Sequence, residues 1–216
     1  MLNLSLATRG ERLRLLCLGA HADDIEIGCG GTVLRLVEEH PGIEVRWVVF
    51  SGGGEREREA RASAADFLAG AARPTIETMG FRDGYFPFQG TAIKDEFERL
   101  KRAFDPTLIL THYKADAHQD HRAVADLTYN TWRNHLILEY EIPKMEGDIG
   151  NPSVFVTLSG AQCRRKVDAL MRHFATQRSR SWFSEETFMA LLRLRGINAS
   201  SPTGYAEAFH CRRAVI

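Results

Sequence analysis

Apolar residues along the chain gather in short continuous runs, separated by longer segments in which apolar and polar residues mix. The short runs are rich in leucine, isoleucine and valine, as expected for strands that are buried on both faces of a parallel sheet. We predict strands at residues 12–20, 43–50, 75–79, 107–112, 137–142 and 154–158. The mixed segments predict helices at residues 32–39, 55–68, 94–104, 123–133, 161–175 and 185–195.

Strand and helix alternate through the first two-thirds of the chain. This order predicts an α/β fold, a Rossmann-like three-layer α/β/α sandwich whose mostly parallel sheet has right-handed crossovers. Residues 144–153, KMEGDIGNPS, are the only candidate boundary, and we interpret them as a long loop. We therefore expect residues 1–216 to form a single domain, with functional side chains beyond the carboxyl ends of the strands.

Composition narrows the classes of partner. The chain has 28 basic and 28 acidic residues, so its net charge does not favour nucleic acid or an anionic membrane surface. No apolar stretch approaches the roughly 20 residues that span a bilayer, and the first residues, MLNLSLATRGER, lack the pattern of a secretory signal. The four cysteines are far apart and form no C-x-x-C pair. These features predict a cytoplasmic protein without disulfides.

The stretch LGAHADDIEIGCGGT, residues 18–32, follows the first predicted strand and has three interpretations. A dinucleotide-binding fingerprint fails at its third glycine, and the second strand ends without an acidic residue for a ribose. A polar loop explains the glycines, which would turn the chain into its helix, but not the crowding of a histidine with two aspartates. The third interpretation is a metal site.

A metal site needs a third ligand from another strand end. The loop that follows the strand at 107–112 offers His112, His118, Asp120 and His121. In a parallel sheet this loop can lie beside the loop after the first strand, at the topological switch point. Two clusters of histidine and aspartate would then meet, which favours the metal site. We interpret His112 as a packed residue.

The two clusters together resemble the motifs of a known family. HADDIEIGCGGT and HQDHR resemble the paired motifs of the PIG-L/LmbE-like zinc-dependent N-deacetylases, H-P-D-D-E and H-P-D-H. Residues 58–70, FRDG, HFATQ and GYAEAF are similar to further segments of that family, so the resemblance covers nearly the whole chain. Ala22 and Gln119 stand where the family has proline, and Arg61 where it has an acid. Members deacetylate N-acetylglucosamine units carried on phosphatidylinositol, thiol precursors or antibiotics.

The resemblance implies roles for individual residues. It assigns His21, Asp24 and His121 as ligands of Zn²⁺, with Fe²⁺ or another divalent ion as an alternative. Asp23 would be the general base for a metal-activated water that attacks the amide. His118 would act as an imidazolium that stabilises the oxyanion and protonates the amine, with Asp120 hydrogen-bonded to it.

Three further residues are candidates for substrate binding, each with a plain structural alternative. Arg58 lies in a charged helix that is otherwise a solvated face, and Asp83 precedes a glycine in a turn. Glu207 belongs to a segment whose apolar–polar alternation is also typical of an edge strand. We expect a small amino-sugar conjugate as the partner, no nucleic acid or membrane, and a homo-oligomer.

The expected function is thus removal of an N-acetyl group from an N-acetylated amino sugar or its conjugate. Two alternatives stay open: a zinc hydrolase of another amide or ester, and a catalytically silent carbohydrate-binding protein on the same scaffold.

Overall fold

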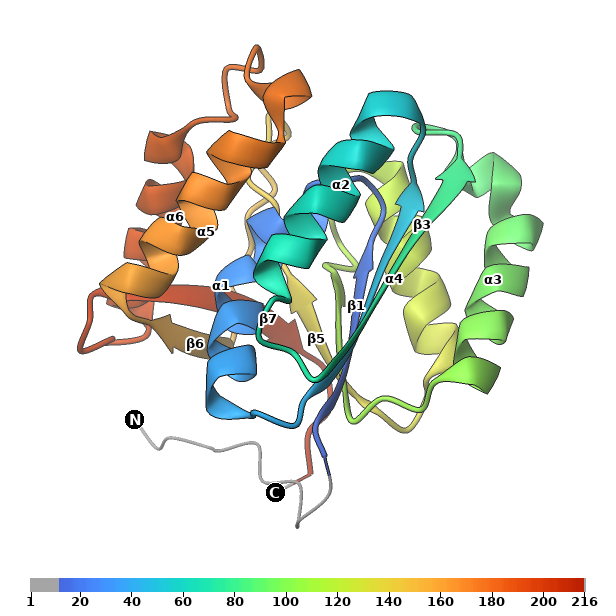
Figure 1. Ribbon diagram of the computed structural model, residues 1–216, viewed down its shortest axis with the longest axis horizontal. Coiled ribbons are helices and arrows are strands. Elements are labelled where there is room, and N and C mark those ends of the chain that lie inside the picture. Colours follow the sequence, from blue (N-terminus) through green and yellow to red (C-terminus); the bar gives the residue numbers. More distant parts are fainter. Residues whose placement is uncertain (1–11, 216) are drawn as a thin grey trace.

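Seven strands form one sheet in the order β3–β2–β1–β4–β5–β7–β6 (Figure 1). The computed structural model describes residues 12–215, so the first residues, where we predict no secretory signal, lie outside the described part. The strands are β1 Arg14–Gly19, β2 Glu44–Ser51, β3 Arg73–Phe81, β4 Leu108–His112, β5 Leu136–Tyr140, β6 Val154–Leu158 and β7 Tyr205–Cys211. The helices are α1 Asp24–Glu39, α2 Gly54–Phe67, α3 Gly90–Ala103, α4 Gln119–Thr131, α5 Gly160–His173 and α6 Glu185–Asn198, with 3₁₀ turns η1 Phe86–Gln89 and η2 Ala175–Gln177.

The sheet is parallel from β3 to β5. Strand β1 pairs in parallel with both β2 and β4, and β4 pairs in parallel with β5. Strand β7 runs antiparallel between β5 and β6, so it is an interior strand and not the edge strand that its alternation suggested. The predicted α/β class with a mostly parallel sheet is confirmed.

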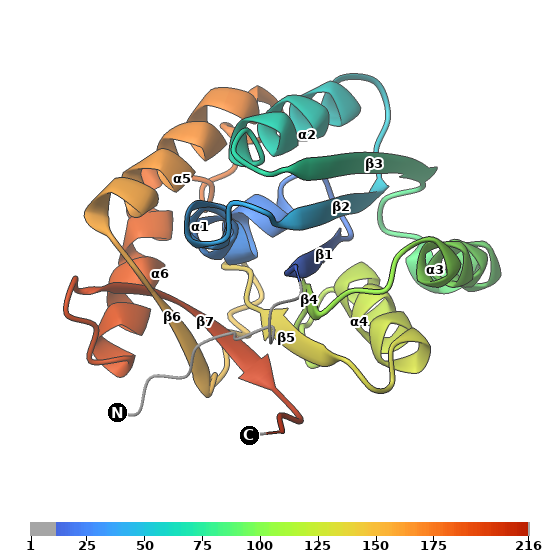
Figure 2. The ribbon, with the colours of Figure 1, turned by 60° about the horizontal axis from the view of Figure 1, so that its bottom comes forward.

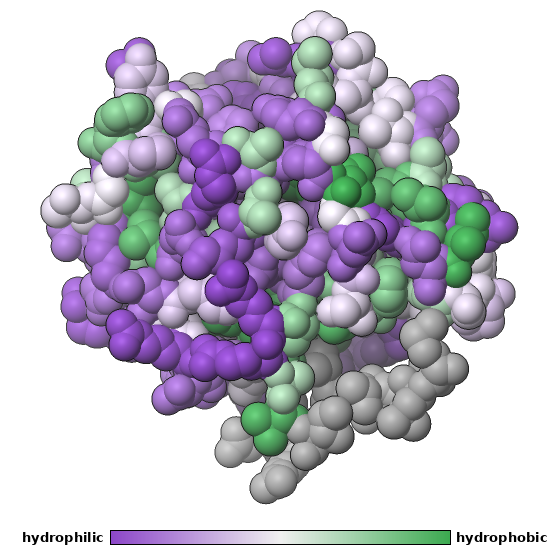
Figure 3. Space-filling model, turned by 180° about the vertical axis from the view of Figure 1, so that it is seen from behind, coloured by the Kyte–Doolittle hydropathy of each residue, from purple (hydrophilic) through white to green (hydrophobic). Residues whose placement is uncertain are grey.

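Helices cover both faces of the sheet. Helices α1, α2, α5 and α6 lie on one side, and α3 and α4 lie on the other (Figure 2). Each side has its own buried apolar cluster: Trp47 and Phe67 belong to the first, and Phe97 and Trp132 to the second. On the face turned away from the viewer of Figure 1, hydrophobic side chains gather only in small groups among hydrophilic ones (Figure 3).

Helix α1 begins at Asp24, not at Thr32 as predicted. The glycines of the opening stretch therefore lie inside the helix. A Cβ at Gly28 would overlap the ring of Tyr140, and one at Gly31 would overlap Leu158. The glycines thus serve close packing of α1 on the sheet, and the turn we expected of them is not formed. Tertiary packing outweighs the low helix propensity of glycine here.

Helix α4 also begins earlier than predicted, at Gln119 in place of Ala123. The segment predicted as a loop at 81–90 contains the end of β3 and the turn η1. The early start of α4 brings Asp120 and His121 onto a helix, whereas Asp83 stays in a turn between β3 and η1. Within residues 12–215, no helix has the length and apolar content that crossing a bilayer requires.

The packing of α1 gives a first prediction. Gly28→Ala should destabilise the protein, because overpacking against Tyr140 costs about 1–3 kcal/mol and outweighs a gain in helix propensity of about 1 kcal/mol. Gly90→Ala is the matched control, since it lies at the start of α3 and no atom lies within 4 Å of the position that its added methyl group would take. Urea unfolding of both variants measures the difference. Equal stability of the two variants would contradict the packing argument.

Candidate metal centre

The site forms where β1 and β4 lie side by side. Leu15, Leu16 and Cys17 of β1 pair with Leu108, Ile109 and Leu110 of β4, so both strands end at the same edge of the sheet. The loop after β1 carries His21 and leads into α1, which starts with Asp24. The loop after β4 leads into α4, whose first turn holds His121. The expected meeting of the two clusters is therefore confirmed.

The three predicted ligands converge on one point. His21 Nδ1 lies 3.2 Å from His121 Nε2 and 3.3 Å from Asp24 Oδ2, and His121 Nε2 lies 3.5 Å from Asp24 Oδ1. Tetrahedral zinc with bonds of about 2.0–2.1 Å holds its ligand atoms about 3.3–3.4 Å apart. The three side chains are at most 10% exposed. Two imidazoles and one carboxylate at these spacings fit a zinc ion with a fourth position free for water.

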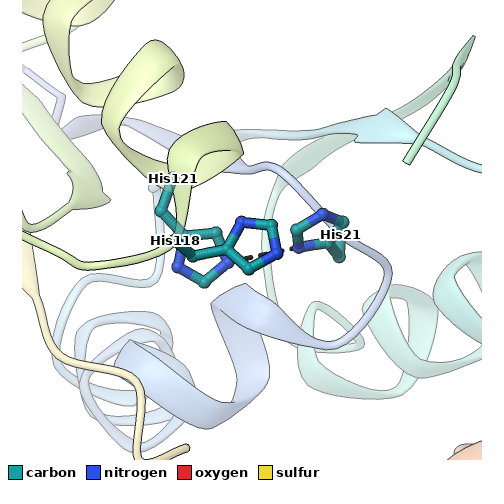
Figure 4. A group of neighbouring side chains, drawn as sticks. All are labelled: His21, His118 and His121. Carbon is teal, nitrogen blue, oxygen red and sulfur yellow. Dashed lines mark hydrogen bonds between the residues drawn. The ribbon is translucent and has the colours of Figure 1, made fainter. Parts of the chain in front are cut away.

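His118 lies beside this triad. Its ring points toward those of His21 and His121 (Figure 4), with ring centroids 4.9 Å and 4.6 Å away. Within residues 12–215, three groups could hold a metal: His21–His118–His121, Asp24–His112–His121 and His21–Asp83–Asp120. All three overlap the predicted triad in at least one residue. The site is thus a single cluster with more ligating atoms than one ion needs.

Asp23 lies next to the triad with one carboxylate oxygen unbound. Its Oδ1 accepts a hydrogen bond of 3.0 Å from Arg56, while its buried Oδ2 has no partner among the described residues. Burial raises the pKa of Asp23 above the usual range of an aspartate, and the opposing effect of Arg56 does not cancel this rise. A buried carboxylate with a free oxygen and a raised pKa is suited to accept a proton.

The predicted pairing of Asp120 with His118 is wrong in detail. The Asp120 carboxylate accepts hydrogen bonds from the backbone N–H groups of Gly84 (2.6 Å) and Phe86 (3.1 Å), and lies 3.4 Å from His21 Nε2. Only the backbone N–H of Asp120 reaches His118, donating to its Nδ1 at 3.2 Å. His118 caps helix α4 in this way.

This geometry also changes the expected charge of His118. Burial and the neighbouring His121 and His21 lower the pKa of His118, which disfavours the imidazolium that we predicted. Since Nδ1 accepts a hydrogen bond, the neutral ring carries its proton on Nε2. His118 can therefore still donate one hydrogen bond into the site.

Sequence reasoning missed Asp116, which fixes the orientation of His121. Its Oδ2 lies 3.0 Å from His121 Nδ1, and its Oδ1 accepts from the backbone N–H of His118 at 2.7 Å. Lys144 donates to Asp116 at 3.0 Å and to Asp148 at 2.6 Å, and is itself 8% exposed. Carboxylates that hold the second nitrogen of a ligating histidine tune metal sites. An acidic residue shortly before a ligand histidine was the signal that could have found it.

Two other features of these loops hold the site together. His112 is fully buried, and its Nε2 accepts a hydrogen bond of 2.9 Å from the backbone N–H of Ala20. It joins the end of β4 to the end of β1, and the same Nε2 lies 3.1 Å from Asp24 Oδ2. His112 thus contacts a predicted ligand, and our interpretation of a merely packed residue is incomplete. Gln119, where the family has proline, donates to the carbonyl of Gly84 and so holds the turn that carries Asp83. Ala22 is buried in the core.

The three predicted substrate-binding residues have different locations. Asp83 joins the cluster, with Oδ1 3.0 Å from His21 Nε2 and a side chain that is 73% exposed. Arg58 does not join it: its side chain is 77% exposed and nears only Glu55, whereas Arg56 reaches Asp23. The alternation of arginine and glutamate along this helix gave no signal to distinguish Arg56 from Arg58.

The Glu207 side chain is buried in the protein interior and does not lie at the candidate metal site. Its carboxylate accepts from the backbone N–H groups of Gly31 (2.8 Å) and Thr32 (2.6 Å) and pairs with Lys166 at 2.6 Å. Lys166 also donates to the carbonyl of Ile27 at 2.7 Å, and both charged side chains are 3% exposed. This pair ties the middle of α1 to α5 and β7, which is a structural role.

Glu207→Ala should therefore cost stability. It leaves the Lys166 ammonium buried without its partner, which costs about 3–5 kcal/mol. Glu38→Ala is the control, because the exposed pair of Glu38 with Arg165 also joins α1 to α5 but contributes about 0–1 kcal/mol. Thermal unfolding compares the two variants. An unchanged melting temperature in Glu207→Ala would contradict the structural role.

Comparison with known proteins places the chain in a family. The family model described as PIG-L, GlcNAc-PI de-N-acetylase, matches residues 16–132, more than half of the chain. The uncharacterized deacetylase YaiS of Escherichia coli K12 is 30% identical over 181 residues, which cover 78% of this chain and 94% of YaiS.

Solved structures share the fold. The N,N′-diacetylchitobiose deacetylase of Pyrococcus horikoshii has a TM-score of 0.70 and 20% identity, covering 92% of this chain and 83% of its own. The 4-carboxy-2-hydroxymuconate hydratase GalB of Pseudomonas putida KT2440 has a TM-score of 0.72 and 18% identity, covering 94% and 98%. Because GalB is a hydratase, the fold alone does not name the reaction. The family model and YaiS support a deacetylase, an amide hydrolase, and the chain belongs to the PIG-L family of GlcNAc-PI de-N-acetylases.

Proposed function

We propose that this protein removes the N-acetyl group from an N-acetylated amino sugar or sugar conjugate of the N-acetylglucosamine type, using zinc bound by His21, Asp24 and His121. The observation that carries the proposal is the convergence of these three side chains at 3.2–3.5 Å beside the unpartnered Oδ2 of Asp23. Family membership and the activity named for the Pyrococcus horikoshii enzyme support an acetylated amino sugar as substrate.

Zinc bound at this triad would polarise the amide carbonyl and lower the pKa of a bound water. Asp23 would accept the proton of the attacking water through Oδ2 and return it to the nitrogen of the leaving amine, while Arg56 holds its Oδ1 in place. His118 donates from Nε2 toward the acetyl oxygen as negative charge develops there. The exposed carboxylate of Asp83 accepts hydrogen bonds from sugar hydroxyls.

The charges around the triad suit a divalent cation. Burial alone would raise the pKa of Asp24, but His121, His112 and His21 hold it well below the usual range of an aspartate. Asp24 is therefore ionised and ready to ligate at neutral pH. Which of several similar divalent ions occupies such a site depends on their availability in the cell, so Fe²⁺ is the alternative metal. Metal analysis of protein purified without added zinc identifies the native ion.

The assay that tests the function measures acetate released from N-acetylglucosamine conjugates by zinc-loaded protein. Asp23→Ala should lower kcat about 10²–10⁴-fold, the usual contribution of a general base, while the bound zinc stays at the wild-type level. Loss of zinc from Asp23→Ala would instead make Asp23 a ligand. Sugar binding without any acetate release by the zinc-loaded wild type would favour a silent carbohydrate-binding protein.

The role of Asp116 is tested by metal affinity. Asp116→Ala should weaken zinc binding about 10–100-fold, because His121 loses the group that orients its ring. Asp126→Ala is the control: Asp126 is also on α4, but it is 57% exposed and pairs with Lys114 away from the triad. Competition with a chromophoric chelator measures both affinities. Equal affinity in Asp116→Ala and wild type would exclude the orienting role.

A further inference from the structure

Exposed hydrophobic side chains are concentrated in two segments of the described chain. Seven large hydrophobic side chains are exposed in residues 12–215, and four of them lie in two segments, at 82–88 and 144–149. The other three, Leu194, Ile197 and Val215, lie on α6 and near the carboxyl terminus. Single exposed hydrophobic residues are ordinary, whereas a concentration around a site marks a binding surface.

The first segment, residues 82–88, is attached to the site by its backbone. Gly84 and Phe86 donate to the Asp120 carboxylate, and Asp83 contacts His21. Phe86 is buried, with its ring centroid 6.0 Å from that of His21. The backbone on both sides of Tyr85 is therefore attached to residues of the site, and the Tyr85 side chain is 41% exposed.

Two aromatic rings of this segment are open to solvent. Tyr85 is 41% exposed and Phe88 is 79% exposed, with their ring centroids 6.2 Å apart. The guanidinium of Arg82 lies 3.7 Å from the centroid of the Tyr85 ring and so holds one face of it. We call Tyr85 and Phe88 the aromatic pair.

The second segment, residues 144–149, is attached to the residues that precede α4. Lys144 binds Asp116, and Asp148 accepts from the backbone N–H of Ala117 at 2.6 Å. Lys144 and Asp148 pair with each other, and their side chains are only 8% and 15% exposed. The hydrophobic side chains that the segment presents to solvent are Met145, 83% exposed, and Ile149, 40% exposed.

Both segments are thus bonded to residues at the start of α4, close to His118 and His121. The acetyl carbonyl must lie at the buried ligand triad to react, so the small acetyl group does not extend to either segment. With the acetyl group at the triad and the sugar against Asp83, the group attached to the sugar is the part of the substrate nearest the exposed side chains of these segments. Aromatic and aliphatic side chains at that position bind an apolar group by removing it from water.

We propose that the natural substrate carries an apolar aglycone, an aryl or alkyl group on the acetylated amino sugar, and that Tyr85 and Phe88 contact it. This inference rests on the proposed function and adds the substrate class. Met145 and Ile149 of the second segment are further candidates for contact with the same group.

The test compares phenyl and methyl N-acetyl-β-D-glucosaminide as substrates of the zinc-loaded protein. The wild type should show a kcat/KM about tenfold higher for the phenyl glycoside, mostly through a lower KM, since burying an aromatic ring is worth at least that factor. The double variant Tyr85→Ala/Phe88→Ala should bring this ratio close to one. Phe88→Leu, which keeps an apolar side chain, should retain most of the preference.

Ile197→Ala is the matched control, because Ile197 is 62% exposed on α6, outside the two segments. It should keep the wild-type ratio of the two substrates. Equal kcat/KM for phenyl and methyl glycosides in the wild type would overturn the inference. So would sedimentation that shows a wild-type oligomer dispersed by the double variant, because the aromatic pair would then be a contact between subunits.

A binding measurement separates this inference from the proposed function. If neither glycoside releases acetate while zinc is bound, the proposed function fails. Calorimetric titration with phenyl and methyl β-D-glucosaminide, the deacetylated glycosides, then decides the inference by itself. Tighter binding of the phenyl glycoside that is lost in the double variant supports an apolar ligand, and equal binding of the two glycosides rules it out.

Discussion

The parallel pairing of β1 with β4 is the constraint on which the rest of the site depends. These strands are far apart in the chain, yet Leu15 pairs with Leu108, and both strands end at the same edge. Each strand is followed by a loop with histidine and aspartate, and each loop leads into a helix. His112 then connects the two strand ends by accepting a hydrogen bond from Ala20. Without this pairing the two motifs would remain two unrelated polar loops.

The site also requires that α1 lie close against the sheet, because the start of this helix carries Asp23 and Asp24. Gly28 and Gly31 let the helix approach Tyr140 and Leu158, and the Glu207–Lys166 pair binds backbone groups in the middle of the helix. Residues that looked like a polar loop are thereby fixed at a helix start. Asp24 faces the histidines, whereas the adjacent Asp23 faces Arg56. The two neighbouring carboxylates therefore lie in different electrostatic environments. Their pKa values move in opposite directions for that reason.

Much of this arrangement could be predicted from the sequence. Apolar runs located the strands, and the rule that parallel strands share a functional edge predicted that the two loops with histidine and aspartate lie together. The family resemblance selected His21, Asp24 and His121 among their residues. Local patterns could not place contacts between distant segments. The pairing of Asp116 with Lys144, the choice of Arg56 over Arg58, and the interior position of β7 all depend on packing. The early start of α1 escaped prediction because glycines disfavour helices unless packing demands them.

The central claim is that one metal ion binds at His21, Asp24 and His121, with Asp23 beside it and not among its ligands. Anomalous diffraction at the zinc edge from crystals of zinc-loaded protein tests this most directly. The account predicts a single peak about 2.0–2.1 Å from His21 Nδ1, His121 Nε2 and an oxygen of Asp24. A peak within bonding distance of Asp23, or one centred between His118 or His112 and the other histidines without Asp24, would contradict it.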